Sequence, residues 1–558
     1  MLLAFVVVLP VSVMLSIARS PLHGPVHVIF LALSIIGTVP AVIYKARVDD
    51  LYPGNVHSSF GWFVLFLLAV HFGAGFFENV LGWAMRKPVS AVSSAPHPHH
   101  TLASDDADAD AAADRASLGS VTLDGHDDDY FLPCDDSADL YPSEFGYRYT
   151  DAADGGREYV LETADDLEKL SLPHHPSSVE YRVQHAIATY FEPVRRAVSR
   201  LPDRLLTFLY LAASVTFALL NRPLILIGFF QIMSGIVTAT NLGMHDKIFG
   251  LLAHFIKGSV FFWFGILTFG RVLGAYANLG WAWNVRPPVP LSRQSLGARF
   301  FRCSMETVES GLIFFYGITN IFLEHLGNRD GKWSHKDLQH ASIAFMYIGG
   351  GLCGLLFESS LIRSLFNASI RSKLPRRRIT SGQKANGSSP PLDASSAARA
   401  SSLSSRPASA LAVDPRAAEP VQYASSSNPF PLFTVFFTGV LMSQHQQATE
   451  LSTKIHMQWG YLLCIGAIFR AITYLSFFHS PLKSYLPARP MTEILTSFCL
   501  MAAGVIFVAS SEQIVNAMLY HGLDGMFTMN VAVGAVALLM AWIMILMALK
   551  GWALQRRS

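Results

Sequence analysis

Val308–His325 has the sequence VESGLIFFYGITNIFLEH, and the next apolar run, His340–Glu358, has the sequence HASIAFMYIGGGLCGLLFE. A membrane-spanning helix needs about 20 consecutive, mainly apolar residues, and both runs approach that length. A short polar stretch joins them, so two helices formed here are expected to be antiparallel neighbours. The histidines that end one run and begin the next would then lie near the same membrane face.

The rest of the chain repeats this pattern. Of its 558 residues, 51% are hydrophobic and only 15% are charged, a balance that excludes an ordinary soluble domain. About eleven or twelve runs have spanning length, and few alternate with a period of two. They begin near Leu2, Val28, Ser59, Leu205, Leu224, Ile248, Val308, Ala341, Pro431, Ile455, Thr492 and Met526. The sequence therefore predicts an all-α polytopic membrane protein, with about 11–12 transmembrane helices in two bundles embedded in a lipid bilayer.

Two polar stretches interrupt the apolar runs and define the expected organisation. Residues 86–202 are acidic and carry too few large apolar side chains to form a core, so disorder is expected, with a surface helix at the end. Residues 371–428 are rich in Ser, Pro and Arg and are expected to form a flexible loop. The transmembrane segments would then occupy residues 1–85, 203–284, 299–370 and 429–558.

Charge and cysteine content exclude several classes of function. The formal net charge is +2 and no basic patch interleaves with aromatics, so a nucleic-acid partner is not expected. The five cysteines form no CxxC pair, which argues against a thiolate zinc site or a disulfide framework. Basic residues gather before the seventh run, after the eighth and tenth runs and at the C-terminus. Alternate threading places them on one side, so the C-terminus is predicted to be cytoplasmic; neither the organelle nor a protein partner is indicated.

Five histidines of the C-terminal half are expected near the opposite face: His325, His335, His340, His445 and His456. Neutral imidazoles and a carboxylate suit zinc, copper or iron. The candidate metal ligands are Glu324, His325, His340, His445 and His456, with Asp337 as a residue that orients them and Glu512 and His521 as further members. The alternative is a hydrogen-bonded network that joins helix ends. Arg470 is expected to tie helices together by pairing with Glu358 or another inward acid.

Three histidines of the N-terminal half are candidate haem ligands. His27 begins the second run, His57 begins the third and His254 lies in the sixth. Ionisable side chains are costly inside a membrane, so each is a candidate for function. The alternative is a histidine at the membrane interface bonded to a nearby carbonyl, and this alternative is preferred for His23.

Several long motifs carry a resemblance. They are Tyr316-Gly317-Ile318, Asn320-Ile321-Phe322-Leu323-Glu324-His325, Trp333-Ser334-His335, Asp337-Leu338-Gln339-His340, Met442-Ser443-Gln444-His445-Gln446, Arg489-Pro490-Met491-Thr492-Glu493 and Ala541-Trp542. From about Arg299 to Ala553 the chain resembles the C-terminal region of the fungal Ytp-like integral membrane proteins. The N-terminal block resembles the domain found upstream in that family, which is similar to the cytochrome b561 core; Tyr52–His57, Gly61-Trp62 and Ala253-His254-Phe255 carry this likeness.

The second likeness implies a helical core in which histidines of alternate helices pair around two b haems. His27, His57 and His254 then correspond to ligands on its second, third and fourth helices. The first-helix ligand has no counterpart, because the chain begins Met1-Leu2-Leu3, and the first helix is therefore expected to be truncated or to lack its ligand.

Three classes of function remain open. The first is haem-binding transmembrane electron transfer, with a metal-binding His-rich bundle; the protein would then be an electron-transfer oxidoreductase. The second is an intramembrane zinc-dependent hydrolase that uses the C-terminal cluster. The third is a transporter or structural membrane protein whose histidines are structural or conduct protons.

Overall fold

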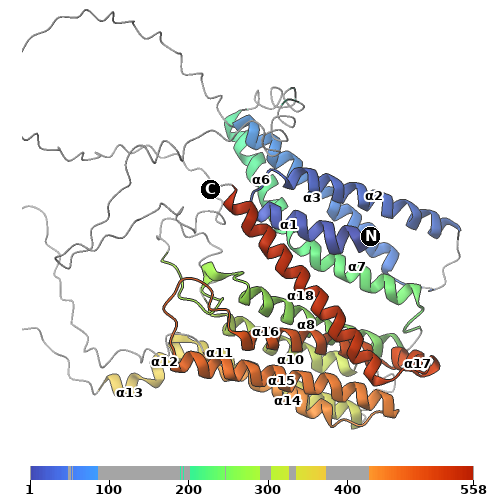
Figure 1. Ribbon diagram of the computed structural model, residues 1–558, viewed down its shortest axis with the longest axis vertical. Coiled ribbons are helices and arrows are strands. Elements are labelled where there is room, and N and C mark those ends of the chain that lie inside the picture. The colour runs from blue at the N-terminus through green and yellow to red at the C-terminus, as the bar shows by residue number, and fades with distance from the viewer. Residues whose placement is uncertain are drawn as a thin grey trace, which may run out of the picture. The chain divides into compact units, whose positions relative to one another are not determined.

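A computed structural model describes residues 2–47, 52, 54–85, 189, 193, 202–244, 247–288, 303–325, 333, 335–372 and 427–556. Every regular element in these ranges is a helix, so the predicted all-α fold is confirmed (Figure 1). The two polar stretches, 86–202 and 371–428, lie almost entirely outside the described residues.

All twelve predicted runs form helices. Their bounds are η1 (Leu3–Val8) with α1 (Leu9–Ile17), α2 (His23–Arg47), α3 (His57–Met85), α6 (Asp203–Asn221), α7 (Pro223–Ala239), α8 (Ile248–Val272), α10 (Met305–His325), α11 (His335–Glu358), α14 (Pro429–Ser443), α15 (Glu450–His479), α16 (Met491–Ala509) and α18 (Gly525–Gln555). Within the described part of the chain, eight are long and apolar enough to cross a membrane: α2, α3, α6, α8, α11, α15, α16 and α18. The segments Leu3–Ile17, Pro223–Ala239 and Pro429–Ser443 are shorter apolar helices, and α10 begins with the acids Glu306 and Glu309. The predicted multi-pass architecture is therefore confirmed. In the described part of the chain, eight helices are candidate membrane spans by the criteria of length and hydropathy.

The chain divides into two compact units. The first unit comprises Met1–Thr238 and Leu549–Ser558, and the second comprises Ala239–Ala548. The boundary falls at the C-terminal end of α7, inside the range 203–284 that was expected to complete the N-terminal block.

The first unit is organised around α3. Buried or inward residues recur on this helix every three or four positions, including Val64, Leu68 and His71, so they share one face. That face packs against α6, where Gly75 leaves room for the ring of Phe217: a Cβ at Gly75 would lie 3.0 Å from ring carbons. The apolar core of the unit includes Phe5, Leu9, Phe30 and Leu224 as well.

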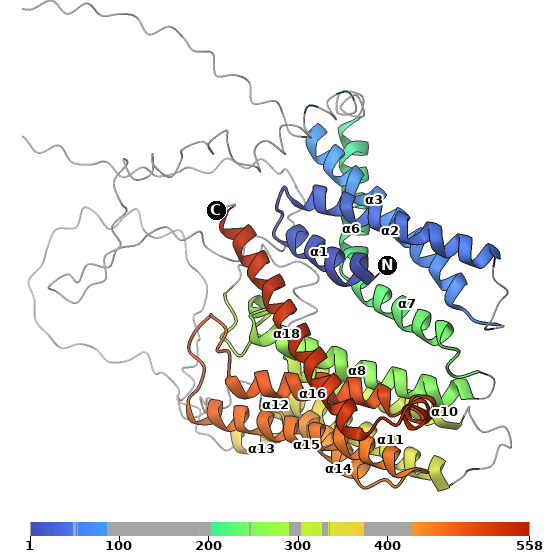
Figure 2. The ribbon, with the colours of Figure 1, turned by 45° about the vertical axis from the view of Figure 1, so that its right-hand side comes forward.

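The second unit is a bundle in which α8 packs on α16, α16 on α15, α15 on α14, and α10 on α11 (Figures 1 and 2). Its helices approach closely at glycines. A Cβ on Gly258 of α8 would lie 2.7 Å from the carbonyl oxygen of Gly504 of α16, and one on Gly439 of α14 would lie 2.5 Å from that of Gly460 of α15. Small residues at crossings are the usual means by which membrane helices pack, since lipid supplies little hydrophobic force between them.

Two contacts set the directions of the helices in the second unit. His254 and His456 meet near the N-termini of α8 and α15, while Arg271 and Arg470, further along the same helices, share a partner carboxylate. The helices α8 and α15 are therefore parallel. We call the two levels of this bundle the histidine end and the arginine end.

Candidate functional site: a buried charge network

Arg271 occupies the last turn of α8 at the arginine end and is 2% exposed. Its Nε donates to the carbonyl oxygen of Trp281 at 2.7 Å, and its guanidinium lies 4.1 Å from the centre of the Trp283 ring. Its two terminal nitrogens donate to Glu309 at 3.1 Å and to Glu306 at 3.3 Å. The two acids are three residues apart in the first turns of α10, so they lie on one helix face.

Glu309 is shared by two arginines. Both of its oxygens accept from Nη1 of Arg470 on α15, at 3.1 and 3.2 Å, in addition to the bond from Arg271. The residue is 1% exposed. Glu309 thus links α8, α10 and α15 through charge-assisted hydrogen bonds, the strongest kind available to side chains.

Arg470 extends the network to a fourth helix. Its Nε lies 2.8 and 3.0 Å from the two carboxylate oxygens of Glu493 in the first turn of α16, and its Nη2 donates to Thr268 Oγ1 at 3.4 Å. Glu493 is fully buried. Arg470 was expected to tie helices through Glu358 or another inward acid, and its partners in the structure are Glu309 and Glu493.

The loop after α8 completes the cradle of Arg271. Asn284 holds this loop: its Nδ2 donates to the carbonyl oxygens of Ala277 and Tyr485, each at 2.8 Å, and its Oδ1 accepts from the Ala282 amide. These bonds fix the Trp281 carbonyl and the Trp283 ring beside the guanidinium. The network is therefore built into the fold and does not depend on chance surface pairing.

The formal charges of the network do not cancel. Arg271 and Arg470 supply two positive charges, whereas Glu306, Glu309 and Glu493 would supply three negative ones. An uncompensated buried charge is very costly, so the group is best satisfied when one carboxyl carries a proton. Glu306 is the natural carrier, because it has the weakest ion pairing of the three acids: a single contact to Arg271 at 3.3 Å. Glu309 has two arginine partners, and both oxygens of Glu493 lie within 3.0 Å of Arg470 Nε.

A further polar atom lies beside the network. Tyr474, one turn after Arg470 on α15, has a buried hydroxyl that makes no hydrogen bond with the described residues. Buried hydroxyls are normally paired, so Tyr474 is an unusual polar group beside the network.

Apolar side chains separate the arginine end from the histidine end. Leu463 on α15 and Met501 and Ile506 on α16 are fully buried between the two levels, and Phe269 and Val536 pack with them. His456 and Arg470 are fourteen residues apart on α15, or about 21 Å along the helix axis. The described side chains therefore form two polar layers with an apolar layer between them.

At the histidine end, His254 and His456 form one pair. Their ring centres are 6.1 Å apart and the rings are nearly perpendicular. Each Nδ1 bonds the carbonyl oxygen four residues earlier, Gly250 at 2.8 Å and Ser452 at 2.7 Å. A carbonyl only accepts, so Nδ1 carries the proton of each neutral ring and Nε2 carries the lone pair that a cation can bind.

His340 and His445 form a second pair, with ring centres 6.4 Å apart. Antiparallel threading predicted that both residues lie near one membrane face, and the structure places their rings side by side. Of the other predicted metal ligands, His456 lies beside His254, while the side chains of Glu324 and His325 lie outside the described residues, as do those of His335 and Asp337. Among the described side chains, no group of three or more His, Cys, Asp and Glu is arranged to hold a metal ion.

Glu512 and His521, which were proposed as further members of the metal cluster, have other neighbours. Glu512 forms an exposed ion pair with Lys247 at 3.3 Å, and His521 packs edge-on against Tyr520. The metal site therefore stays a prediction for the part of the chain that includes Glu324 and His325.

The predicted haem ligands of the first unit have other neighbours. His27 stacks on His71, with ring centres 4.8 Å apart and planes 24° apart, and His71 stacks on Phe217 at 4.7 Å. Axial haem ligands lie on opposite faces of a porphyrin, and no porphyrin fits between two rings in direct contact. As packed here, the pair formed by His27 and His71 does not fit a haem.

His71 and His57 instead make polar ties within the unit. The Oδ1 of Asn221 on α6 accepts from His71 Nε2 at 3.3 Å, while Nδ1 of this buried ring has no hydrogen-bond partner among the described residues. His57 Nδ1 lies 2.9 Å from Ser234 Oγ and accepts from Gln231 Nε2 at 3.3 Å, and both partners lie on α7. His254 belongs to the second unit, so its correspondence to a haem ligand alongside His27 stays a prediction.

Sequence reasoning missed four of the five charged members of the network. Arg271, Glu306, Glu309 and Glu493 all lie within or beside apolar runs. Ionisable residues in such runs are a recognised signal of function, and Glu306 and Glu309 also have the spacing of a single helix face. The partners could not be read from the sequence, because they lie on four different helices.

Comparison with protein families gives two matches. The model described as "Protein YTP1-like, C-terminal" matches residues 227–551, and a domain of unknown function, DUF2427, matches residues 1–81. The first match begins well before Arg299, where the sequence resemblance was placed. Neither match is to a cytochrome, so the likeness to the b561 core stays a prediction.

Two fungal proteins match over the whole chain. "Uncharacterized membrane protein C3B8.06" of Schizosaccharomyces pombe is 34% identical and is covered over 93% of its length. "Uncharacterized membrane protein YCR061W" of Saccharomyces cerevisiae is 35% identical and covered over 82%. "Protein YTP1" of the same yeast is 23% identical over 38% of this chain and 31% of its own length. No solved structure matches.

Proposed function

This chain belongs to the YTP1-like family of integral membrane proteins, and we propose that it is a transporter that moves protons across the bilayer through its second unit. One observation carries the proposal: three buried carboxylates face two buried arginines on four helices of one bundle. The excess carboxyl is the proton site.

The formal charge supports a bound proton more than a purely structural tie. A tie between helices needs equal numbers of acids and bases, since each unpaired charge in a membrane interior is costly. The group formed by Arg271, Arg470, Glu306, Glu309 and Glu493 is fully compensated only when one proton is bound. A group that holds one proton stably can also exchange it when its surroundings change.

The separation of the two polar layers favours a carrier that changes conformation and argues against an open channel. Glu306 and its neighbours lie at the arginine end, and His254 and His456, whose Nε2 atoms can accept a proton, lie at the other. The apolar layer around Leu463 and Met501 interrupts a hydrogen-bonded path between the two polar layers in this conformation. Proton transfer across it requires the helices to move, as in alternating access.

The test is proton flux in liposomes. The full chain is reconstituted in vesicles that contain a pH-sensitive dye, and a potassium gradient with valinomycin sets the membrane potential. Wild type should acidify or alkalinise the lumen faster than protein-free vesicles, and Glu306→Gln should remove the difference. Glu306→Asp keeps the carboxyl and should keep part of the flux.

The matched control is Glu512→Gln, because Glu512 is an exposed acid paired with Lys247 and lies outside the network. Its flux should equal that of wild type. A wild-type rate equal to that of protein-free vesicles would reject proton transport, and so would a Glu306→Gln variant that folds and retains full flux.

Electron transfer is the second candidate, and the pair formed by His254 and His456 favours it. Both rings have Nδ1 fixed on a backbone carbonyl, the arrangement typical of histidines that bind a metal through Nε2. A haem or a redox metal bound there would accept and release electrons. The chain's own contribution would be to orient these imidazoles and to shield them with Phe507, whose ring centre is 5.6 Å from that of His254.

A reduced-minus-oxidised spectrum and metal analysis of the purified protein test this second candidate. A b-type signal or a stoichiometric metal that is lost in His254→Ala would support it. His479→Ala is the matched control, because His479 also bonds the carbonyl four residues earlier, at 2.9 Å, but lies at the opposite end of α15. Zinc lost in both His340→Ala and His445→Ala would instead support an intramembrane zinc-dependent hydrolase that uses the predicted metal ligands of the C-terminal half.

A further inference from the structure

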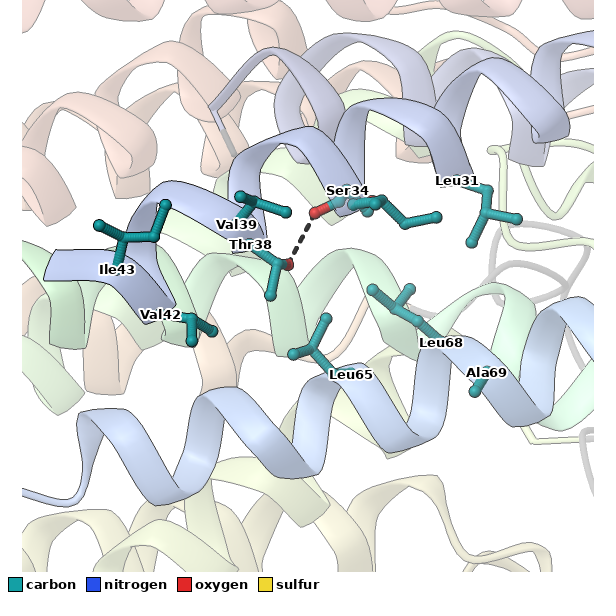
Figure 3. Close-up of a pocket in the computed structure, with 10 residues that line it drawn as sticks. Leu31, Ser34, Thr38, Val39, Val42, Ile43, Leu65, Leu68 and Ala69 are labelled. Carbon is teal, nitrogen blue, oxygen red and sulfur yellow. Dashed lines mark hydrogen bonds between the residues drawn. The ribbon is translucent and has the colours of Figure 1, made fainter. Parts of the chain in front are cut away.

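A cavity of about 420 Å³ lies between α2 and α3 in the first unit (Figure 3). Leu65 and Leu68 point from α3 toward Thr38 and Val42 of α2, and Ser34 lies on the same face of α2. The cavity exists because α2 packs on η1 and α1 while α3 packs on α6, so the two helices leave a groove between them.

The lining of the groove is apolar despite its two hydroxyl residues. Ser34 Oγ donates to the carbonyl oxygen of Phe30 at 2.8 Å, and Thr38 Oγ1 donates to that of Ser34 at 2.7 Å. These bonds turn both hydroxyls onto their own helix. Both hydroxyl protons are therefore used within the helix, so the groove offers a ligand no side-chain donor, and its apolar lining suits a hydrocarbon chain.

The outer edge of the groove is apolar and exposed. Ile35, Val39 and Ile43 of α2 are each about half exposed, and all belong to a candidate membrane span. In a bilayer this surface contacts lipid tails, and a groove of this size between apolar walls is filled by them.

Cations mark one end of the groove. Lys45 and Arg47 lie in the last turn of α2, just beyond Ile43, where the span meets the membrane surface. Lys45 Nζ donates to Ser58 Oγ in the first turn of α3, so the lysine lies across the open end of the groove. The acids Asp49 and Asp50 that follow in the sequence lie outside the described residues.

We propose that this groove is a binding site for an anionic glycerophospholipid of the surrounding membrane. One acyl chain occupies the space between Thr38, Val42, Leu65 and Leu68, and the phosphate of the headgroup lies against Lys45 and Arg47. Basic residues beside apolar grooves at a membrane surface are the usual site for anionic headgroups. This site is separate from the charge network and does not depend on proton transport.

Native mass spectrometry of the full chain in detergent tests the proposal. Phosphatidylserine and phosphatidylcholine with identical acyl chains are titrated separately. Wild type should bind phosphatidylserine at least about fivefold more tightly, since one cation near a membrane surface contributes about that factor. Lys45→Gln and Arg47→Gln should each weaken phosphatidylserine binding by about fivefold. They should weaken phosphatidylcholine binding by less, because the choline cation offsets the charge of its phosphate.

Ala69→Phe tests the groove itself, because Ala69 lines its opening and the larger ring fills it. This variant should weaken binding of both lipids and keep the thermal unfolding temperature of wild type in lipid-free detergent. Lys247→Gln, which removes an exposed lysine of the second unit, is the control and should change neither affinity. Equal binding of the two lipids by wild type, or unchanged binding by a folded Ala69→Phe variant, would overturn the proposal.

Discussion

Nη1 of Arg470 donates to both carboxylate oxygens of Glu309, at 3.1 and 3.2 Å, while the same carboxylate accepts from Arg271 at 3.1 Å. One acid on α10 thus holds the last turn of α8 and the middle of α15. The contact joins segments 161 residues apart in the sequence, and it explains why the helices of the second unit take this arrangement at the arginine end.

Glu309→Gln should be the most destabilising single neutralisation in the network. It leaves two buried guanidinium groups without their shared carboxylate, and removal of one partner from a buried ion pair costs about 3–5 kcal/mol. Thermal unfolding in detergent, followed by tryptophan fluorescence, measures the loss. The control Glu512→Gln should stay within about 0.5 kcal/mol of wild type, as expected for an exposed site.

Glu306→Gln should behave differently. Because this residue is the natural carrier of the proton, its neutral form resembles glutamine, and the free energy of unfolding should fall by less than about 1.5 kcal/mol. The same unfolding assay should therefore rank Glu306→Gln well above Glu309→Gln in stability. The reverse order would show that the proton resides on another carboxyl.

Gly258→Leu should disrupt the crossing of α8 and α16. The new side chain would meet the Gly504 carbonyl, for which even a Cβ lies at 2.7 Å, and overpacking of this kind costs about 1–3 kcal/mol or more. Gly250→Leu on the same helix is the control, because nothing lies within 4 Å of a Cβ at that position. Size-exclusion profiles and unfolding temperatures should separate the two variants clearly.

Positions 340 and 445 should be accessible from the same side of the membrane. Their rings are neighbours, with centres 6.4 Å apart, and the predicted orientation places both on the face opposite the C-terminus. Single cysteines at these positions and at Arg556, introduced in a background without native cysteines, can be labelled with an impermeant maleimide in sealed vesicles. Labelling of 340 and 445 from opposite sides would contradict the fold, and labelling of 556 from the outside would contradict the cytoplasmic C-terminus.

Much of the helical architecture could be read from the sequence. Each of the twelve apolar runs forms a helix, because a segment in lipid must satisfy its own backbone hydrogen bonds. The expectation that His340 and His445 lie at the same end of their helices also followed from the sequence, since it depends only on the order and direction of consecutive helices. The pairing of His254 with His456 did not, because α8 and α15 are far apart in the chain and their contact depends on how the bundle packs.

The sequence by itself determined that this protein is a multi-pass helical membrane protein and placed its ionisable residues along the helices. Only the tertiary structure decided which of those residues meet. Apolar length and helical period are local properties of the chain, whereas the partners of Arg271 and Arg470 depend on the rotation and crossing of four helices. Those crossings are fixed by close contacts such as that of Gly258 with Gly504, which no local pattern specifies.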